Sequence, residues 1–171
     1  MRTVVLGPRP TELEAVIERR RRLGLDTYDE GWQGDHHMAP AGTGQRARVQ
    51  ARLIRALGPQ VSSAAHEVTG PVTIGEPVDL RIPDAAVLPV DADATWHASA
   101  ALVAEVLSPD DETYQKFGFY AAHGIGEVVV VDPAQRRVQV WVRHGDGYRQ
   151  DGASPFLGLS AEDLAAPLGL T

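Results

Sequence analysis

Residues 102–109 of this 171-residue chain read Leu-Val-Ala-Glu-Val-Leu-Ser-Pro. This stretch decides the fold, because a short apolar run ended by Ser-Pro is typical of a strand covered on both faces. Glu105 stands inside that run. Burying an unpaired carboxylate is costly, so Glu105 needs a metal ion, a charged partner or a raised pKa. A strand end that reaches solvent, or a pairing with an arginine such as Arg81, is the alternative.

A second carboxylate, Asp84, follows an earlier pattern typical of a strand. The alternation of apolar residues over 78–82 predicts a strand with one buried face. Pro83 has no N–H to donate, so we expect strand pairing to stop there and Asp84 to lie at the strand end. Asp84 and Glu105 at the ends of adjacent strands would form a hard oxygen site suited to magnesium or manganese.

Lys116 lies a short distance beyond the second carboxylate. Residues 111–122 predict a core helix that carries Lys116 and Tyr120 one turn apart on one face. The long, flexible lysine stem could bring its ammonium to the carboxylates, where it would stabilise charge on a phosphate or help to activate a metal-bound water. Tyr120 could orient Lys116 or a phosphate. The alternatives are a solvated lysine and a tyrosine that simply packs in the core.

The order of these motifs resembles a known family. Pro83-Asp84 comes first, Glu-Val-Leu-Ser-Pro follows at 105–109, then the helical Lys116, then Tyr-Ala-Ala-His-Gly-Ile-Gly-Glu-Val-Val-Val-Val-Asp-Pro at 120–133. Over about residues 28–141 the chain resembles the bacterial Uma-type family of restriction-endonuclease-like proteins, which is similar to the PD-(D/E)xK nucleases.

That resemblance implies metal-dependent hydrolysis of phosphodiester bonds in DNA, with Asp84 and Glu105 holding Mg or Mn. In the nuclease superfamily the lysine lies two residues after the acid, where this chain has Leu107. Lys116 resembles the migrated lysine that Uma-type proteins carry on the following helix. These proteins commonly have a histidine near the start of the first core helix. Here Gln45 or a neighbour stands there, so no role is carried over.

Composition and length limit the classes of protein. With 171 residues and 43% apolar content, we expect one domain over 1–171, with an N-terminal helical extension at 1–27 and a C-terminal tail at 145–171. The absence of cysteine excludes disulfides and thiolate metal sites, and fits a reducing compartment. No signal peptide or membrane span is predicted, so the expected location is cytoplasmic.

The net charge of −7 argues against a protein that coats nucleic acid, but not against a nuclease with local basic contacts. Residues 44–57 predict the first core helix, on which Arg48, Arg52 and Arg55 share one exposed stripe. They are the candidate contacts to DNA phosphates. A merely solvated face is the alternative.

The predicted fold is α/β and restriction-endonuclease-like: a mixed central sheet flanked by helices, preceded by an N-terminal helix and hairpin. The adjacent His36 and His37 would face opposite ways in that hairpin and serve structural roles. The remaining elements expected are a helix at 11–23, a hairpin at 29–38, strands at 64–74 and 76–82, a polar loop at 88–99, antiparallel strands at 126–131 and 137–142 with the former beside 102–107, and a short helix at 160–165.

A second class of function stays open. The chain could be a catalytically silent nucleic-acid-binding module, or a dimeric interaction module, that kept the nuclease fold. Metal binding discriminates between the classes, because a silent descendant need not retain affinity at Asp84 and Glu105.

Overall fold

The structure is a computed structural model that describes residues 3–5, 10–39, 42–61, 65–90, 94–109 and 111–170. Within these residues the larger sheet has six strands in the order β11-β10-β9-β8-β7-β4. Only β8 and β9 run parallel among the paired strands of that sheet, so it is mixed, as predicted. The strands are β4 (His66–Thr69), β7 (Ala85–Pro89), β8 (Leu102–Val106), β9 (Glu127–Asp132), β10 (Arg137–His144) and β11 (Gly147–Asp151).

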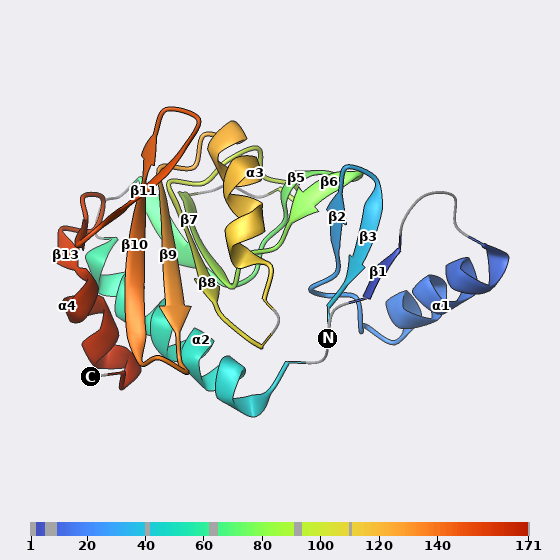
Figure 1. The fold of residues 1–171 in the computed structure, drawn as a ribbon, viewed down its shortest axis with the longest axis horizontal. Coiled ribbons are helices and arrows are strands. Elements are labelled where there is room, and N and C mark those ends of the chain that lie inside the picture. Colours follow the sequence, from blue (N-terminus) through green and yellow to red (C-terminus); the bar gives the residue numbers. More distant parts are fainter. Residues whose placement is uncertain are drawn as a thin grey trace.

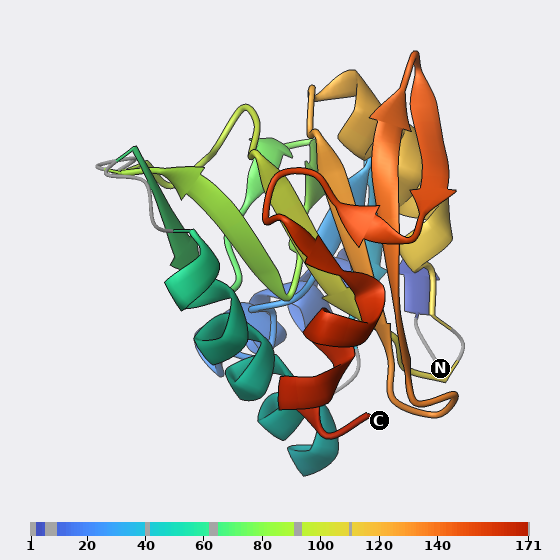
Figure 2. The same cartoon turned by 90° about the vertical axis from the view of Figure 1, so that its left-hand side faces the viewer.

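Helices cover both faces of this sheet (Figures 1 and 2). On one side lie α2 (Gly44–Leu57) and α4 (Ala161–Ala165), which pack on a core that includes Leu102, Ala104 and Val106. On the other lie the 3₁₀-helix η2 (Thr113–Lys116) and α3 (Phe117–Ala122), against a second core that includes Val103. Because side chains alternate along a strand, Glu105 faces the η2 and α3 side.

A smaller sheet lies beyond α3, with α1 (Thr11–Arg22) at the far end (Figure 1). Within the described residues its order is β1-β3-β2-β6-β5. Gln33 and Gly34 both have positive φ and close the β2–β3 hairpin, which confirms the predicted hairpin. Its strands are β1 (Thr3–Val5), β2 (Glu30–Trp32), β3 (Asp35–Met38), β5 (Ile74–Glu76) and β6 (Asp79–Arg81).

Short elements complete the chain. They are η1 (Gly58–Gln60), β12 (Ala153–Ser154), β13 (Leu159–Ser160) and η3 (Ala166–Leu168). The helix predicted at 44–57 is confirmed at both ends, and the strand pairs β8–β9 and β9–β10 are confirmed in direction. Among the described residues no helix is long and apolar enough to cross a membrane.

Three local predictions were wrong. The strand expected at 64–74 is two strands in different sheets, because the chain leaves the larger sheet after Thr69, before Gly70 and Pro71. The polar loop expected at 88–99 begins inside β7, and Asp91 and Asp93 lie outside the described residues. The helix expected at 111–122 is a 3₁₀ turn followed by a short α-helix.

Candidate active site

Asp84 lies immediately before β7, not at the end of a preceding strand as the sequence suggested. β7 pairs antiparallel with β8, and Ala85 is opposite Ala104. One step further along the same register, Asp84 faces Glu105. Both side chains are buried, each with 1% of its surface exposed. The two carboxylates therefore come together at one edge of the β7–β8 pair, although the local structure around Asp84 differs from the prediction.

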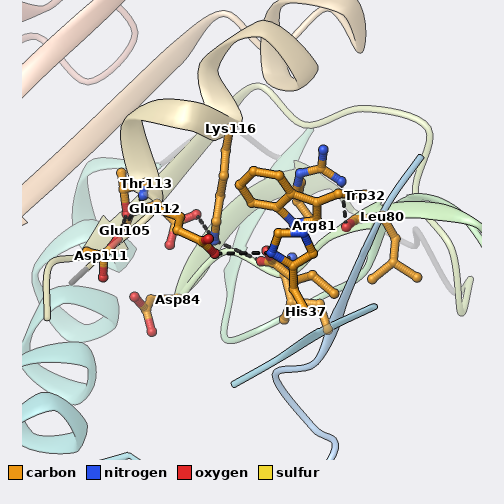
Figure 3. Close-up of polar contacts among 12 residues, drawn as sticks. Trp32, His37, Leu80, Arg81, Asp84, Glu105, Asp111, Glu112, Thr113 and Lys116 are labelled. Carbon is orange, nitrogen blue, oxygen red and sulfur yellow. Dashed lines mark hydrogen bonds and ion pairs between the residues drawn. The ribbon is translucent and has the colours of Figure 1, made fainter. Parts of the chain in front are cut away.

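Glu105 is the acceptor of two side-chain hydrogen bonds. The Lys116 ammonium donates to Glu105 Oε1 at 2.8 Å, and the Tyr120 hydroxyl donates to the same oxygen at 2.6 Å. Lys116 and Tyr120 reach it from η2 and α3, one turn apart, as the helical spacing predicted. Figure 3 shows the lysine pointing from its helix toward Glu105. Tyr120 is both a core residue and a partner of the carboxylate.

Lys116 also contacts a carboxylate that the sequence did not single out. Its ammonium donates to Glu30 Oε1 at 2.8 Å, so a single cation bridges two carboxylates from different sheets. Glu30 is held in turn by the backbone N–H of Ile82 at 2.9 Å and by the indole N–H of Trp32 at 2.9 Å. Lys116 is buried, with 4% exposure. It is also the only lysine in the chain.

Burial and neighbouring charges shift the pKa values of this cluster. Burial raises the pKa of Glu105, Lys116 lowers it, and Asp84 and Glu30 raise it again, to about 7. For Lys116, burial alone would lower the pKa, but Glu105 and Glu30 outweigh burial and raise it above its ordinary value. The lysine therefore keeps its proton at neutral pH. It can donate hydrogen bonds and supply positive charge, but it cannot accept a proton from water.

Asp84 is paired with Arg46, a residue of α2. The guanidinium donates to Asp84 Oδ1 through Nε at 3.2 Å and Nη2 at 3.0 Å, and to Oδ2 through Nη2 at 2.8 Å. The backbone N–H of Val106 donates to Oδ2 at 2.7 Å. Burial would lower the pKa of Arg46, but Asp84 outweighs it and raises the pKa, so the guanidinium stays charged.

A cavity of about 270 Å³ opens beside these groups. Its lining includes the charged side chains of Glu30, Arg46, Glu105, Asp111, Glu112 and Lys116. A larger cavity of about 690 Å³ shares Arg46 and Ser108 with the first, and continues past the turn between β9 and β10. The two cavities thus adjoin at Arg46, and the first of them is also lined by Glu105.

The loop between β8 and η2 fixes the approach of Lys116. Asp111 accepts hydrogen bonds from the Ser108 backbone at 3.0 Å and the Thr113 backbone at 2.8 Å, and from both of their hydroxyls. Burial would raise the pKa of Asp111, but the hydrogen bonds from Thr113 and Ser108 outweigh it and lower the pKa. This ionised carboxylate ties the end of β8 to the start of η2.

A row of stacked side chains supports Glu30 from the smaller sheet. The rings of His37 and Trp32 stack at 4.3 Å, and the Arg81 guanidinium lies 4.2 Å from the ring centres of both Trp32 and Phe119. Arg81 forms its ion pair with Asp79 and, among the described residues, not with Glu105, the alternative left open by the sequence. Figure 3 shows His37, Trp32 and Arg81 side by side, and the contact of Arg81 with Phe119 connects the smaller sheet to α3.

The two adjacent histidines point to different partners, as expected of neighbours on a strand. His37 Nδ1 lies 3.2 Å from Glu112, and His36 Nε2 lies 3.3 Å from Asp29. Within the described residues no group of three or more His, Cys, Asp or Glu side chains is arranged to hold a metal ion.

The three candidate arginines of α2 are exposed but lie away from the carboxylates. Arg52 donates to the Leu168 carbonyl at 3.0 Å, which ties α2 to the C-terminal 3₁₀ turn. The two cavities are lined by Arg46 and not by Arg48, Arg52 or Arg55. Sequence reasoning missed Arg46 although a signal was present, since it continues the buried stripe of Val49 and Leu53 toward the N-terminus of the helix.

Comparisons with known proteins show the family and the fold. Residues 27–171 match the model of the Uma2 family, described as "Putative restriction endonuclease". The chain belongs to the Uma2 family. A solved structure from Anabaena variabilis, titled a putative nuclease belonging to DUF820, is similar over 82% of this chain and 90% of its own, with a TM-score of 0.66 and 16% identity. No curated protein sequence matches the chain significantly.

Membership in the Uma2 family and the shared fold support a restriction-endonuclease-like nuclease that acts on nucleic acid. Nucleases of this fold generally use divalent metal ions. The ligand types present here suit a divalent metal ion. Asp84 and Glu105 offer hard oxygens, and magnesium typically takes one or two carboxylates and keeps several waters. Within the described residues both side-chain hydrogen bonds to Glu105 go to Oε1, and Glu105 lines the cavity.

Proposed function

We propose that the chain is a magnesium- or manganese-dependent endonuclease that hydrolyses phosphodiester bonds in DNA. The observation that carries this proposal is the Lys116–Glu105 pair: a buried ammonium kept charged beside a buried carboxylate, both lining an open cavity. A structural ion pair has no need of a cavity, whereas a group that acts on a substrate requires one.

Each side chain has a distinct role in the proposed reaction. Asp84 and Glu105 would hold the ion, which would supply polarisation of the phosphate and a lowered pKa of water. Lys116 donates hydrogen bonds to the phosphate oxygen on which negative charge develops. Because it stays protonated, it contributes charge and not a base. Tyr120 keeps Glu105 oriented through its 2.6 Å hydrogen bond.

DNA is the proposed substrate because the family is described as "Putative restriction endonuclease". The net charge of −7 gives no long-range attraction to a polyanion, so binding depends on local arginines and on neutralisation of the carboxylates by the ion. Arg48, Arg52 and Arg55 are the proposed contacts to the DNA backbone on the outer face of α2.

Calorimetry with Mg²⁺ and Mn²⁺ tests the site. We expect one site, whose occupancy raises the melting temperature through ligand linkage. Asp84→Asn and Glu105→Gln should abolish both signals and cleavage of a DNA duplex. Glu67→Gln, which changes an exposed glutamate of β4 in the same way, is the matched control and should behave as the wild type. Unchanged metal affinity in both site variants would refute the assignment.

One observation favours the second candidate function, a silent module that kept the fold. In this structure the cation at Asp84 is the guanidinium of Arg46, which meets both carboxylate oxygens. A site that is permanently closed by its own arginine would bind no metal and cleave nothing. The behaviour of Arg46 therefore decides between the two functions.

A further inference from the structure

Arg46 donates to every hydrogen-bond acceptor site of the Asp84 carboxylate that a backbone N–H does not already take. An ionised carboxylate has about four lone-pair sites. At Asp84 three are taken by Arg46, through Nε and Nη2 on Oδ1 and Nη2 on Oδ2, and the fourth by the N–H of Val106. A divalent cation and the guanidinium therefore cannot hold this carboxylate together.

We propose that Arg46 is an exchangeable counter-ion: it neutralises Asp84 in the metal-free protein, leaves when a divalent cation binds, and then binds a phosphate of the nucleic acid in the cavity. This inference rests on the proposed function, since it requires a metal at Asp84 and Glu105. It goes further by assigning to Arg46 two alternating partners, one for each state of the site.

The contacts of Asp84 show which partner would move. The carboxylate remains anchored by the Val106 N–H at 2.7 Å, and the backbone carbonyl of Asp84 accepts a hydrogen bond from Gln50 at 2.8 Å. Asp84 is 1% exposed, whereas the side chain of Arg46 is 29% exposed. These contacts hold Asp84 in place next to β7, whereas the side chain of Arg46 is partly exposed to solvent.

Two cavities adjoin Arg46 and offer space for its guanidinium. Arg46 lines the cavity beside Glu105 and Lys116 as well as the larger cavity next to it. Its Nη1 already lies 3.4 Å from the Ser108 hydroxyl, on the wall that both cavities share. Rotation of the side chain can therefore bring the guanidinium into either opening without moving α2. A planar guanidinium matches a phosphate with two parallel hydrogen bonds.

The contrast with Lys116 supports this division. Lys116 is held between Glu30 and Glu105, with 5% of its side chain exposed, so its position does not depend on the state of Asp84. One cation of the site is thus fixed and the other can exchange. If Asp84 held a divalent cation, Arg46 would lose its partner there, and its charged guanidinium would be available to bind a phosphate.

Calorimetric titration with Ca²⁺ or Mn²⁺ tests the exchange without any cleavage. Removing Arg46 removes the competitor, so Arg46→Ala should bind the cation more tightly, by about tenfold or more. Arg46→Gln, which keeps part of the side-chain volume, is the second variant in case Arg46→Ala does not fold. Arg22→Ala is the control, since it removes an exposed arginine of α1 and should leave the affinity unchanged.

The outcomes separate the two ideas. Equal or weaker metal binding in both Arg46 variants, with the wild type binding through Asp84 and Glu105, overturns the exchange and leaves the proposed function intact. Metal binding only in the Arg46 variants would show that Arg46 does not leave Asp84 in the wild type, which overturns the exchange and places the wild type among silent modules. Absence of metal binding in every protein overturns both.

A second measurement follows the released guanidinium. Fluorescence anisotropy with a short DNA duplex gives the slope of log K against log salt, and Ca²⁺ occupies the site without supporting cleavage. With Ca²⁺ bound, Arg46→Ala should reduce that slope by about one, the contribution of one phosphate contact. Without metal it should not change the slope, because Arg46 is then on Asp84. An equal reduction in both conditions would show that Arg46 never leaves for the metal.

Discussion

Lys116 and Glu30 meet at 2.8 Å although 86 positions separate them in the chain. The contact joins the smaller sheet to the helix that carries the lysine. It also gives the ammonium a second carboxylate, so the charge on Lys116 does not depend on Glu105 alone. The proposed active site is therefore built by both sheets, and four of the predictions below follow from that construction.

Lys116→Met should lower phosphodiester cleavage by about 100-fold or more, the scale expected when one group that stabilises the transition state is removed. Metal affinity should remain close to that of the wild type, because Asp84 and Glu105 are unchanged. Single-turnover kinetics and calorimetry measure the two quantities. Cleavage at the wild-type rate would return Lys116 to a purely structural role.

The same substitution should destabilise the metal-free protein by about 3–5 kcal/mol, since it leaves two buried carboxylates without their cation. Binding of a divalent cation should recover part of that loss. Urea unfolding with and without Mg²⁺ measures both values. A loss that is equal with and without metal would show that the ion does not approach Glu105.

Glu30→Gln tests the second carboxylate. We expect the pKa of Lys116 to fall, because Glu30 is one of the charges that raise it. The chain has a single lysine, so ¹⁵N-lysine labelling gives one side-chain ammonium signal to follow with pH. Cleavage should fall while metal affinity is retained. Glu76→Gln, an exposed glutamate of the same sheet, is the control, and an identical pKa in Glu30→Gln would contradict the assignment.

The pKa of Glu105 predicts how stability changes with pH. The pKa is raised from 4.5 to about 7 in the folded protein, so between these values the folded state binds more protons than the unfolded state. The contribution of Glu105 to stability therefore falls as pH rises through that window. Glu105→Gln does not titrate and should gain stability relative to the wild type from pH 5 to pH 7. Urea unfolding at both values, with Glu67→Gln as the control, measures the change.

The arginines of α2 give a separate prediction for DNA binding. Replacing Arg48, Arg52 and Arg55 with glutamine should weaken binding and reduce the salt slope by up to about 3, with metal affinity unchanged. Because Arg52 already donates to the Leu168 carbonyl, its own share should be smaller than that of the other two. Single variants measured by anisotropy separate the contributions. An unchanged slope in the triple variant would exclude this face of the helix.

The parts of the site that lie near one another in sequence could be predicted. Glu105 stands out because a carboxylate interrupts an apolar strand, and Lys116 and Tyr120 share a helical face because the chain is α-helical from Phe117 onward. The pairing of β8 with β9 follows from the order strand, helix, strand. These signals depend on local periodicity, which the sequence displays directly.

The partners that come from distant segments could not be predicted. Glu30 lies in a three-residue strand whose sheet is completed by residues 74–81, and no local pattern relates it to Lys116. Helical spacing places Arg46 on the inner face of α2, but no local pattern relates it to Asp84, which lies 38 positions away in the chain. The start of β7 was hidden by Pro83 and Asp84, which suggested the end of a strand and not the beginning of one.

The stacked row of His37, Trp32, Arg81 and Phe119 has a consequence for how the protein could be monitored. Trp32 sits between an imidazole and a guanidinium, and its indole N–H reports directly on Glu30. Its fluorescence should therefore respond when Lys116 and its carboxylates change charge. Retaining Trp32 while replacing Trp96 and Trp141 with phenylalanine would give the protein a built-in optical signal, read from the smaller sheet, for events on the larger one.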